Sequence, residues 1–375
     1  MRESFSSTAK APSHDTLKLF VAISLCSMIL AISLIDPWTS MVEATSNLIK
    51  EETESKGIHG REPSFSKDIN VKSFDVTSRV SFREVSGFRS SLMSDSSYPV
   101  WFESIGGEYE DICYDIASSG DSVYVVGYTD KYEVGYADVL VARISKSDGS
   151  IEWIVVFGGE DEDYGFGAYL REEYLYIAGM TKSFGYGSND VLVAKVSIYD
   201  GSLQWIIVFG GSDYDCGNGI TVDENSVYVT GGMCGLGVGA FDVFIASLST
   251  LDGSLEWLKT IGGTYNEHGI DITISGDYLY VVRETSSFGT SGNNIFTIEL
   301  SSSDGTLEWM STIEIDGEDP AYAIAVSDGD IYLLGQTVGL ADGFPDVLVA
   351  SLSSTDGSLV WTTVFGGEGE KVVAT

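Results

Sequence analysis

From residue 98 onward, apolar and polar positions alternate in short runs bounded by turn residues. The first unit holds four such runs, at 112–118, 122–128, 138–145 and 150–157, rich in Val, Ile, Tyr and Trp and separated by Gly, Asp and Ser. Runs of this length and composition predict β-strands. No apolar positions recur at the helical period of 3.6 residues, which excludes a helical solenoid.

The group of four runs repeats every 52 residues. A Trp recurs at this spacing without any change of register, at Trp101, Trp153, Trp205, Trp257, Trp309 and Trp361. An Asp-Gly turn precedes each of the last five tryptophans, and a Tyr lies in the second run of each full unit. A fixed period of this size indicates one supersecondary unit repeated as an array.

The third run of the first unit, Val139-Leu140-Val141-Ala142, is apolar on both faces. A strand buried on both faces requires sheets packed face to face, as in neighbouring blades of a β-propeller. We expect the Asp148-Gly149 turn to close the hairpin between the third and fourth strands, with the Gly at positive φ. We expect each Trp to pack across the interface between blades. The predicted fold is an all-β propeller of four-stranded antiparallel blades.

Five full blades are predicted, at 112–157, 164–209, 216–261, 268–313 and 320–365. Residues 100–105 resemble a fourth strand, and residues 372–375 resemble the beginning of a first strand. These two ends allow a partial sixth blade in a chain that stops early, or a five-bladed ring with a spare strand.

The acidic charge of the chain is concentrated in the repeats. The net charge is −36 over the whole sequence, and residues 98–375 hold 44 acidic against 9 basic residues. Such a field repels nucleic acid and anionic membrane surfaces, and it favours cations or cationic partners. It equally serves solubility.

The N-terminus carries an export signal. Arg2, Lys10 and Lys18 precede an apolar run at 19–35 that Asp36 ends. Its length suits the core of a signal peptide or a short membrane anchor, and both place the repeats outside the cytoplasm. We therefore expect a protein that is secreted, or anchored to the membrane by this run alone.

The domain limits follow from these patterns. Residues 1–44 form the signal peptide or signal-anchor, with a small-residue cleavage site at Ala44 as one alternative. Residues 45–97, rich in Ser, Lys and Glu, are predicted to be a flexible spacer. Residues 98–375 form the repeat domain.

Two series of acidic residues keep the spacing of 52. Antiparallel connectivity places the loop that enters each blade and the loop between its second and third strands at the same end of the blade. The entering series is Asp111, Asp163, Asp215, Glu267 and Asp319, and the second series is Asp138, Asp190, Asp242, Asn294 and Asp346. One face of the propeller is therefore predicted to display two carboxylates per blade.

Two of the entering loops contain Asp-x-Asp-x-Gly. They are Asp161-x-Asp163-x-Gly165 and Asp213-x-Asp215-x-Gly217. Several oxygens from a tight loop suit Ca²⁺, which is the one cofactor that the sequence suggests. A third acidic residue and a closing Glu are missing from the motif. The alternative is that these side chains bond the backbone of their own turns.

The cysteines permit one disulfide. Cys216 and Cys234 lie nearly opposite each other about the turn at 224–225, so an exported protein could bridge them. The alternative is a pair of buried thiols.

The repeats resemble the bacterial and archaeal β-propeller repeats called SBBP, over about residues 100–375. The resemblance lies in Phe157-Gly158-Gly159, Asp163, Asp190-Val191-Leu192-Val193-Ala194-Lys195 and Asp200-Gly201-Ser202-Leu203-Gln204-Trp205. It implies a secreted or surface-displayed propeller with no settled activity.

A weaker similarity links the spacing from Gly149 to Trp153 to the tryptophan-docking repeats of pyrroloquinoline-quinone propellers. Those enzymes use a vicinal Cys pair, and no Cys-Cys pair occurs in this sequence. The fourth blade departs from the repeat, because Arg283 replaces a Gly and Glu314-Ile315 replaces a Gly-Gly pair.

No catalytic constellation stands out. His268 is the single His of the repeats, which argues against a His-based triad or a zinc site. Loop aromatics offer stacking surfaces for sugars, at Tyr136, Phe184, Tyr186, Phe241, Phe288 and Phe344. We expect a non-enzymatic surface scaffold or binding module for a protein or glycan, without nucleic acid. The alternatives are an extracellular enzyme acting on polysaccharide and a fragment of a larger surface protein.

Overall fold

The computed structural model describes residues 104–106, 110–130, 136–235, 241–263, 265, 267–285, 294–313, 320–337, 346–365 and 371–374. The predicted signal segment and spacer lie outside these residues, as does most of the strand predicted at 100–105. Within the described residues the chain is all-β and contains no α-helix. No helix long and apolar enough to cross a membrane occurs in this part of the chain.

The strands form five antiparallel sheets, one per repeat, and each keeps its strands in chain order. The first holds β1 (Asp111–Ser119), β2 (Ser122–Thr129), β3 (Asp138–Ser145) and β4 (Ile151–Phe157). The second holds β5 (Asp163–Arg171), β6 (Tyr174–Thr181), β7 (Asp190–Ser197) and β8 (Leu203–Phe209). The third holds β9 (Asp215–Val222), β10 (Ser226–Cys234), β11 (Phe241–Ser249) and β12 (Leu255–Ile261). The fourth holds β13 (Glu267–Ser275), β14 (Tyr278–Thr285), β15 (Asn294–Ser301) and β16 (Leu307–Ile313). The fifth holds β17 (Ala321–Ser327), β18 (Asp330–Thr337), β19 (Asp346–Ser353), β20 (Leu359–Phe365) and β21 (Lys371–Ala374).

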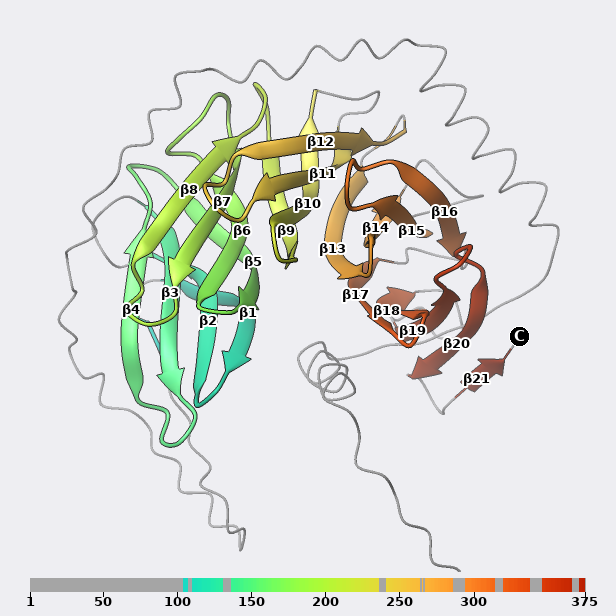
Figure 1. Cartoon of the computed structure of the whole chain (residues 1–375), viewed down its shortest axis with the longest axis horizontal. Helices are drawn as coiled ribbons and strands as arrows, with labels where there is room; N and C mark the ends of the chain where they lie inside the picture. The colour runs from blue at the N-terminus through green and yellow to red at the C-terminus, as the bar shows by residue number, and fades with distance from the viewer. Residues whose placement is uncertain are drawn as a thin grey trace, which may run out of the picture.

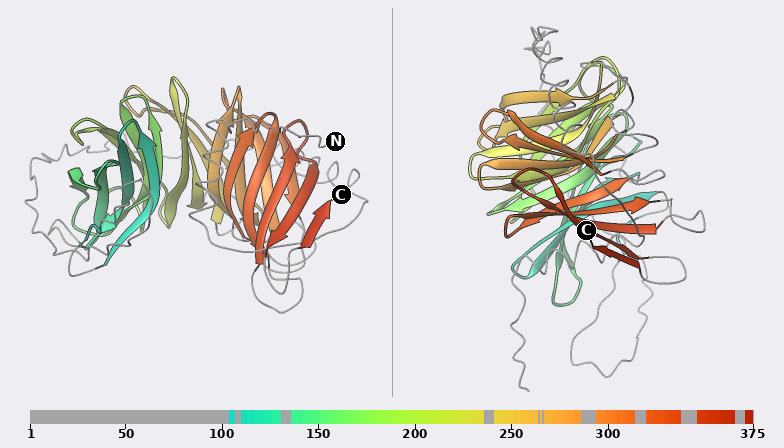
Figure 2. Two further views of the ribbon diagram at one scale, coloured as in Figure 1. Left: turned by 90° about the horizontal axis from the view of Figure 1, so that it is seen from below. Right: turned by 90° about the vertical axis from the view of Figure 1, so that its right-hand side faces the viewer.

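Successive sheets follow one another around an arc, with the first strand of each sheet on the inner side (Figure 1). Neighbouring first strands pack against each other from β1 to β5, β9, β13 and β17. The perpendicular views show the sheets standing side by side as blades (Figure 2). The predicted propeller of five four-stranded blades is confirmed.

The C-terminal strand corrects one expectation. Residues 372–375 were expected to begin the first strand of a sixth blade, but β21 pairs antiparallel with β20, and Lys371 lies opposite Val364. A fourth strand at the edge of a sheet presents unpaired backbone groups, and β21 satisfies part of that row.

Four of the repeated Trp residues join neighbouring blades, and the turn glycines have positive φ, as predicted. Trp153 Nε1 donates to the carbonyl of Ile198 in the next blade at 3.3 Å. The same bond recurs from Trp205 to Thr250, from Trp257 to Ser302 and from Trp309 to Ser354. The turn glycines adopt φ values of 70–75°, a conformation that favours Gly.

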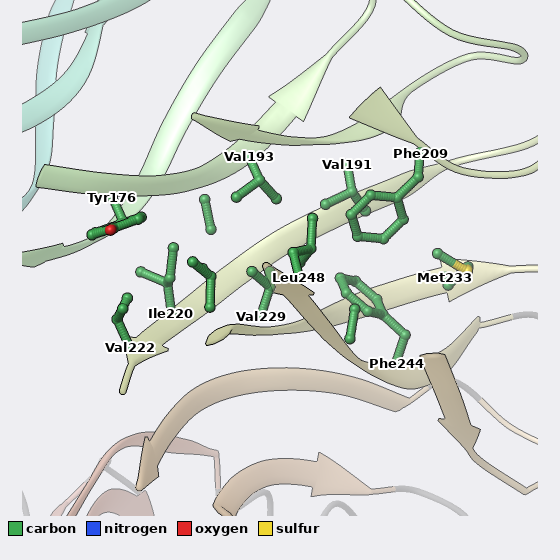
Figure 3. Close-up of a cluster of buried hydrophobic side chains, with 13 residues drawn as sticks. Tyr176, Val191, Val193, Phe209, Ile220, Val222, Val229, Met233, Phe244 and Leu248 are labelled. Carbon is green, nitrogen blue, oxygen red and sulfur yellow. The ribbon is translucent and has the colours of Figure 1, made fainter. Parts of the chain in front are cut away.

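The core lies between the blades. Val139 and Val141 of β3 are fully buried on one face, and Leu140 and Ala142 are buried to the same degree on the other. Between the second and third blades, Val191 and Phe209 on one side face Val229 and Phe244 on the other (Figure 3). These clusters hold the ends of the strands in fixed register, and the acidic residues lie at those ends.

Candidate functional site

Strand register places the two acidic series on either side of one position at the end of the second strand. Thr129 lies opposite Asp111 on β1 and opposite Asp138 on β3. Thr181 has the same relation to Asp163 and Asp190 in the second blade. The two series therefore lie at one end of the propeller.

The carboxylates do not form an exposed face, which corrects the expectation that they are displayed on the loops. Asp138 and Asp190 are 2% and 3% exposed, and Asp163 and Asp215 are 0% exposed. Each lies close to an acid of the adjacent blade, because the strand that enters one blade runs beside the third strand of the blade before it. We call the pairs Asp138–Asp163, Asp190–Asp215 and Asp242–Glu267 the inter-blade pairs.

The first inter-blade pair closes around Gly158. A Cβ at that position would lie 2.0 Å from Asp138 Oδ1 and 2.6 Å from Asp163 Oδ2, so both oxygens flank one small space that only Gly leaves open. Asp163 Oδ2 accepts hydrogen bonds from Gly159 N and Ser183 Oγ, both at 2.7 Å. Asp138 Oδ1 is buried and accepts no hydrogen bond from the described residues.

Burial and the neighbouring carboxylate change the proton affinity of this pair. Burial first, and then the charges of Asp163 and Asp130, raise the pKa of Asp138 to about 7. Burial also raises the pKa of Asp163, although hydrogen bonds from Thr181, Ser183 and Gly159 oppose the rise. Asp138 is therefore the carboxyl of this pair that holds a proton more readily.

The second pair repeats this geometry between β7 and β9. A Cβ on Gly210 would lie 2.3 Å from Asp190 Oδ1 and 2.5 Å from Asp215 Oδ2. Gly211 N donates to Asp215 Oδ2, and Cys234 N donates to Asp215 Oδ1 at 2.8 Å. Burial and the charge of Asp215 raise the pKa of Asp190 to about 7.

The third pair contains a cation of the protein itself. Gly263 N donates to Glu267 Oε2 at 2.8 Å, in the same way as in the other pairs. Arg283 is fully buried, and the negative charges of Glu267 and Asp242 oppose the fall that burial causes in its pKa, to about 10. The Arg that breaks the repeat therefore lies where two buried carboxylates need a positive charge.

The other predicted metal ligands do not join these pairs into a larger cluster. Asp161 and Asp213 are exposed, whereas Asp163 and Asp215 two residues later are buried, so the acids of Asp-x-Asp-x-Gly diverge. Asp111 accepts a hydrogen bond from Thr129 Oγ1 at 2.5 Å, and Asp346 begins β19. Asp319 lies outside the described residues. In the described part of the chain, no group of three or more His, Cys, Asp or Glu residues is placed to hold a metal.

The predicted disulfide is not present. Cys216 and Cys234 are free cysteines, and the register places Gly232 opposite Cys216. Cys234 lies two residues beyond Gly232 on β10, so it is not directly opposite Cys216.

An aromatic patch that the sequence analysis did not predict lies at the same end. Tyr114 packs edge-on against Phe166, with 5.1 Å between the ring centroids. The ring centroids of Tyr128 and Tyr164 are 4.5 Å apart. Tyr114 is 49% exposed, Tyr164 and Phe166 are half-buried, and Tyr128 is buried at 7% exposed. The signal was available, because this position of the repeat is aromatic at Tyr114, Phe166 and Tyr322 and is not aromatic at Asn218 and Ile270. We call Tyr114, Tyr128, Tyr164 and Phe166 the aromatic patch.

The predicted loop aromatics are more scattered. Tyr136 and Tyr186 are 70% and 60% exposed, and Phe184 is half-buried. Phe241 packs against His268 at 4.7 Å between ring centroids. Phe288 and Phe344 lie outside the described residues.

Two inner-strand acids also break the repeat. Asp115 Oδ2 accepts Ala168 N at 2.7 Å, and Asp271 Oδ2 accepts Ile324 N at 3.0 Å, each from the next blade. Burial raises the pKa of Asp271 to about 6. Each of these carboxylates therefore joins the first strand of its own blade to the first strand of the next blade, and this contact accounts for the acid at that position.

No protein-family model matches the chain, and no curated protein matches it. The chain is similar to the Neurospora crassa Pan2 WD40 domain, with a TM-score of 0.45, 8% identity and coverage of 68% of this chain and 73% of that one. It is similar to Cellvibrio cellulosa α-L-arabinanase, with a TM-score of 0.34, 14% identity and coverage of 69% and 94%. Quinohemoprotein alcohol dehydrogenase from Comamonas testosteroni gives a TM-score of 0.40, 12% identity and coverage of 67% and 42%.

The chain spans less than half the length of that dehydrogenase. At this level of similarity none of the three transfers an activity to this chain. The propeller assignment rests on the sheets themselves, and the likeness to SBBP repeats stays a prediction.

Proposed function

We propose that this propeller is a non-enzymatic binding module that acts outside the cytoplasm and holds a glycan on the aromatic patch. The single observation that carries the proposal is the exposed ring of Tyr114, which packs edge-on against half-buried Phe166 of the next blade. Aromatic faces supply apolar area, and the hydroxyl groups of Tyr supply hydrogen bonds. The apolar run and flanking charges of the N-terminus support export.

The acidic surface limits the choice of ligand. Residues 98–375 hold 44 acidic against 9 basic residues, so a neutral or cationic glycan is favoured over an anionic one. A protein partner with a basic surface is the competing ligand.

One observation favours an enzyme acting on polysaccharide. Asp138, with its pKa raised to about 7, lies beside Asp163, and two carboxylates with different proton affinities are the usual machinery of glycoside cleavage. Both carboxylates are buried, however, and a catalytic acid must reach the oxygen that it protonates. This burial supports binding over hydrolysis.

The test is a glycan array probed with the whole protein, followed by titration of the best ligand. Tyr114→Ala and Phe166→Ala should weaken binding at least tenfold. Tyr199→Ala, which removes a 63% exposed Tyr from the turn between β7 and β8, should leave binding unchanged. If the protein binds a basic protein and no glycan, its ligand is that protein. If the bound glycan releases reducing sugar, the protein is an enzyme that acts on polysaccharide.

A further inference from the structure

A second exposed tyrosine repeats the arrangement of Tyr114 two blades further along the arc. Tyr214 is 37% exposed and immediately precedes β9, the first strand of the third blade. Phe241 packs edge-on against it, with 5.8 Å between the ring centroids and 76° between the ring planes. Phe166 packs against Tyr114 in the same way, at 80°. In both cases a half-buried Phe holds an exposed Tyr ring in a fixed orientation.

The 52-residue repeat does not produce this likeness. Two repeats before Tyr214 and Phe241, the chain has Glu110 and Ala137, and two repeats after Tyr114 it has Asn218. The same pair of rings is therefore built from different positions of the repeat. A contact that every blade needs for folding recurs at one position, as the Trp contacts do, so a ligand explains these rings better than folding does.

Contacts within the second blade connect the two exposed rings. Tyr164 of the aromatic patch lies opposite Met180 in the pairing of β5 and β6. Tyr214 Oη donates to Met180 Sδ at 3.5 Å, and Met180 itself is only 5% exposed. Burial first, and then the charges of Cys216 and Tyr114, raise the pKa of Tyr214, so the two tyrosines lie within range of each other's charge. The two rings therefore belong to one surface, with Met180 buried beneath it.

The same surface continues onto the fourth blade. His268 packs against Phe241, with 4.7 Å between the ring centroids. Gly232 leaves the space for this imidazole, because a Cβ at that position would lie 2.3 Å from His268 Nδ1. Burial lowers the pKa of His268, although the charge of Glu267 opposes the fall. Near neutral pH the imidazole therefore offers one hydrogen-bond donor and one acceptor without a charge, which suits the hydroxyl groups of a sugar.

Two exposed rings on one surface suit a chain of sugar units better than a single sugar, because each ring can pack against a different unit. We propose that Tyr214, Phe241 and His268 form a second subsite for the glycan, and that the ligand is a linear oligosaccharide without acidic groups that reaches from Tyr114 to Tyr214. This inference rests on the proposed function, since it extends the glycan site of the aromatic patch.

The experiment is calorimetric titration of the whole protein with a short and a long ligand. The probes are unbranched β-1,4-linked oligomers of glucose, mannose, xylose and N-acetylglucosamine, each as the dimer and the hexamer. The hexamer of the recognised sugar should bind at least about tenfold more tightly than its dimer, because two subsites on one chain raise the effective concentration at the second. Tyr114→Ala and Tyr214→Ala should each reduce the affinity for the hexamer to about that for the dimer.

Two further variants control for folding and for unspecific contact. Tyr214→Phe keeps the ring and should retain most of the affinity for the hexamer, with circular dichroism to confirm that each variant is folded. Tyr278→Ala is the matched control, because Tyr278 is 41% exposed and lies at the opposite end of its blade, at the start of β14. It should leave the affinity for both lengths unchanged.

The outcomes separate the second subsite from the proposed function. Equal affinity for dimer and hexamer, or a Tyr214→Ala variant that keeps the full gain of the hexamer, would overturn the second subsite while the glycan site at Tyr114 stands. Absence of binding at both lengths for all four sugars would overturn the second subsite and the glycan site together.

Discussion

Trp205 of the second blade lies directly against Gly253 of the third. A Cβ on Gly253 would lie 3.0 Å from Cε3 of the indole and 2.5 Å from a side-chain carbon of Ile207. Gly253 also has φ of +74°. This Gly is therefore required twice, once for its backbone conformation and once because the Trp of the preceding blade occupies the space of a side chain.

Replacing this Gly should separate the two requirements. Gly253→Ala should cost about 1–2 kcal/mol for the left-handed backbone and about 1–3 kcal/mol more for displacing the Trp. Gly276→Ala is the matched control, because Gly276 has φ of +59° with nothing within 4 Å of its Cβ position. Urea unfolding of both variants measures the difference. Equal losses would show that the Trp contact contributes nothing.

Removing the buried guanidinium should destabilise the fourth blade. Arg283→Met removes the buried guanidinium that the charges of Glu267 and Asp242 favour, and leaving buried carboxylates without their compensating charge costs about 3–5 kcal/mol. Thermal unfolding measures the loss, with Lys259→Met, at an exposed Lys, as the control. A loss no larger than that of Lys259→Met would show that the buried charge contributes nothing.

The protein should become less stable as pH rises toward neutrality. The pKa of Asp138 and of Asp190 is about 7 in the folded chain, and an ordinary Asp in the unfolded chain has a value of about 3.9. Between these values the folded chain binds more protons, so stability falls with rising pH, on the order of 1–3 kcal/mol per carboxyl.

Chemical unfolding from pH 4 to pH 8 measures this dependence. Asp138→Asn with Asp190→Asn should flatten the curve, because an amide does not titrate. Asp148→Asn, in an exposed turn where hydrogen bonds from Ser150 lower the pKa of the carboxyl, should not flatten it. A curve that keeps its slope in the double Asn variant would contradict the assignment.

The thiols should differ in their reactivity. Cys113 is exposed, Cys234 is half-buried and Cys216 is buried with its pKa raised by desolvation. Alkylation of the native protein should therefore label Cys113 first and Cys216 last, and unfolding without reductant should expose all three. Peptide mapping by mass spectrometry measures the order. Recovery of Cys216 and Cys234 in one linked peptide would show that the two residues form a disulfide.

The sequence by itself determined the blades. Apolar runs bounded by turn residues specify strands locally, and a period of 52 residues forces the same unit at each step, so the strand limits and the Trp contacts were predictable. Pairing between acids was not, because Asp138 and Asp163 belong to different blades and meet only when two sheets pack. In the sequence, Arg283 is only a departure from the repeat. Its charge comes close to Asp242 and Glu267 only when the sheets pack. The tertiary structure likewise decided the position of β21. The backbone groups at the edge of β20 bond to whichever strand lies nearest, and the sequence does not specify which strand that is. Local backbone preferences fix a repeat from within one unit, whereas burial and charge compensation depend on contacts between units.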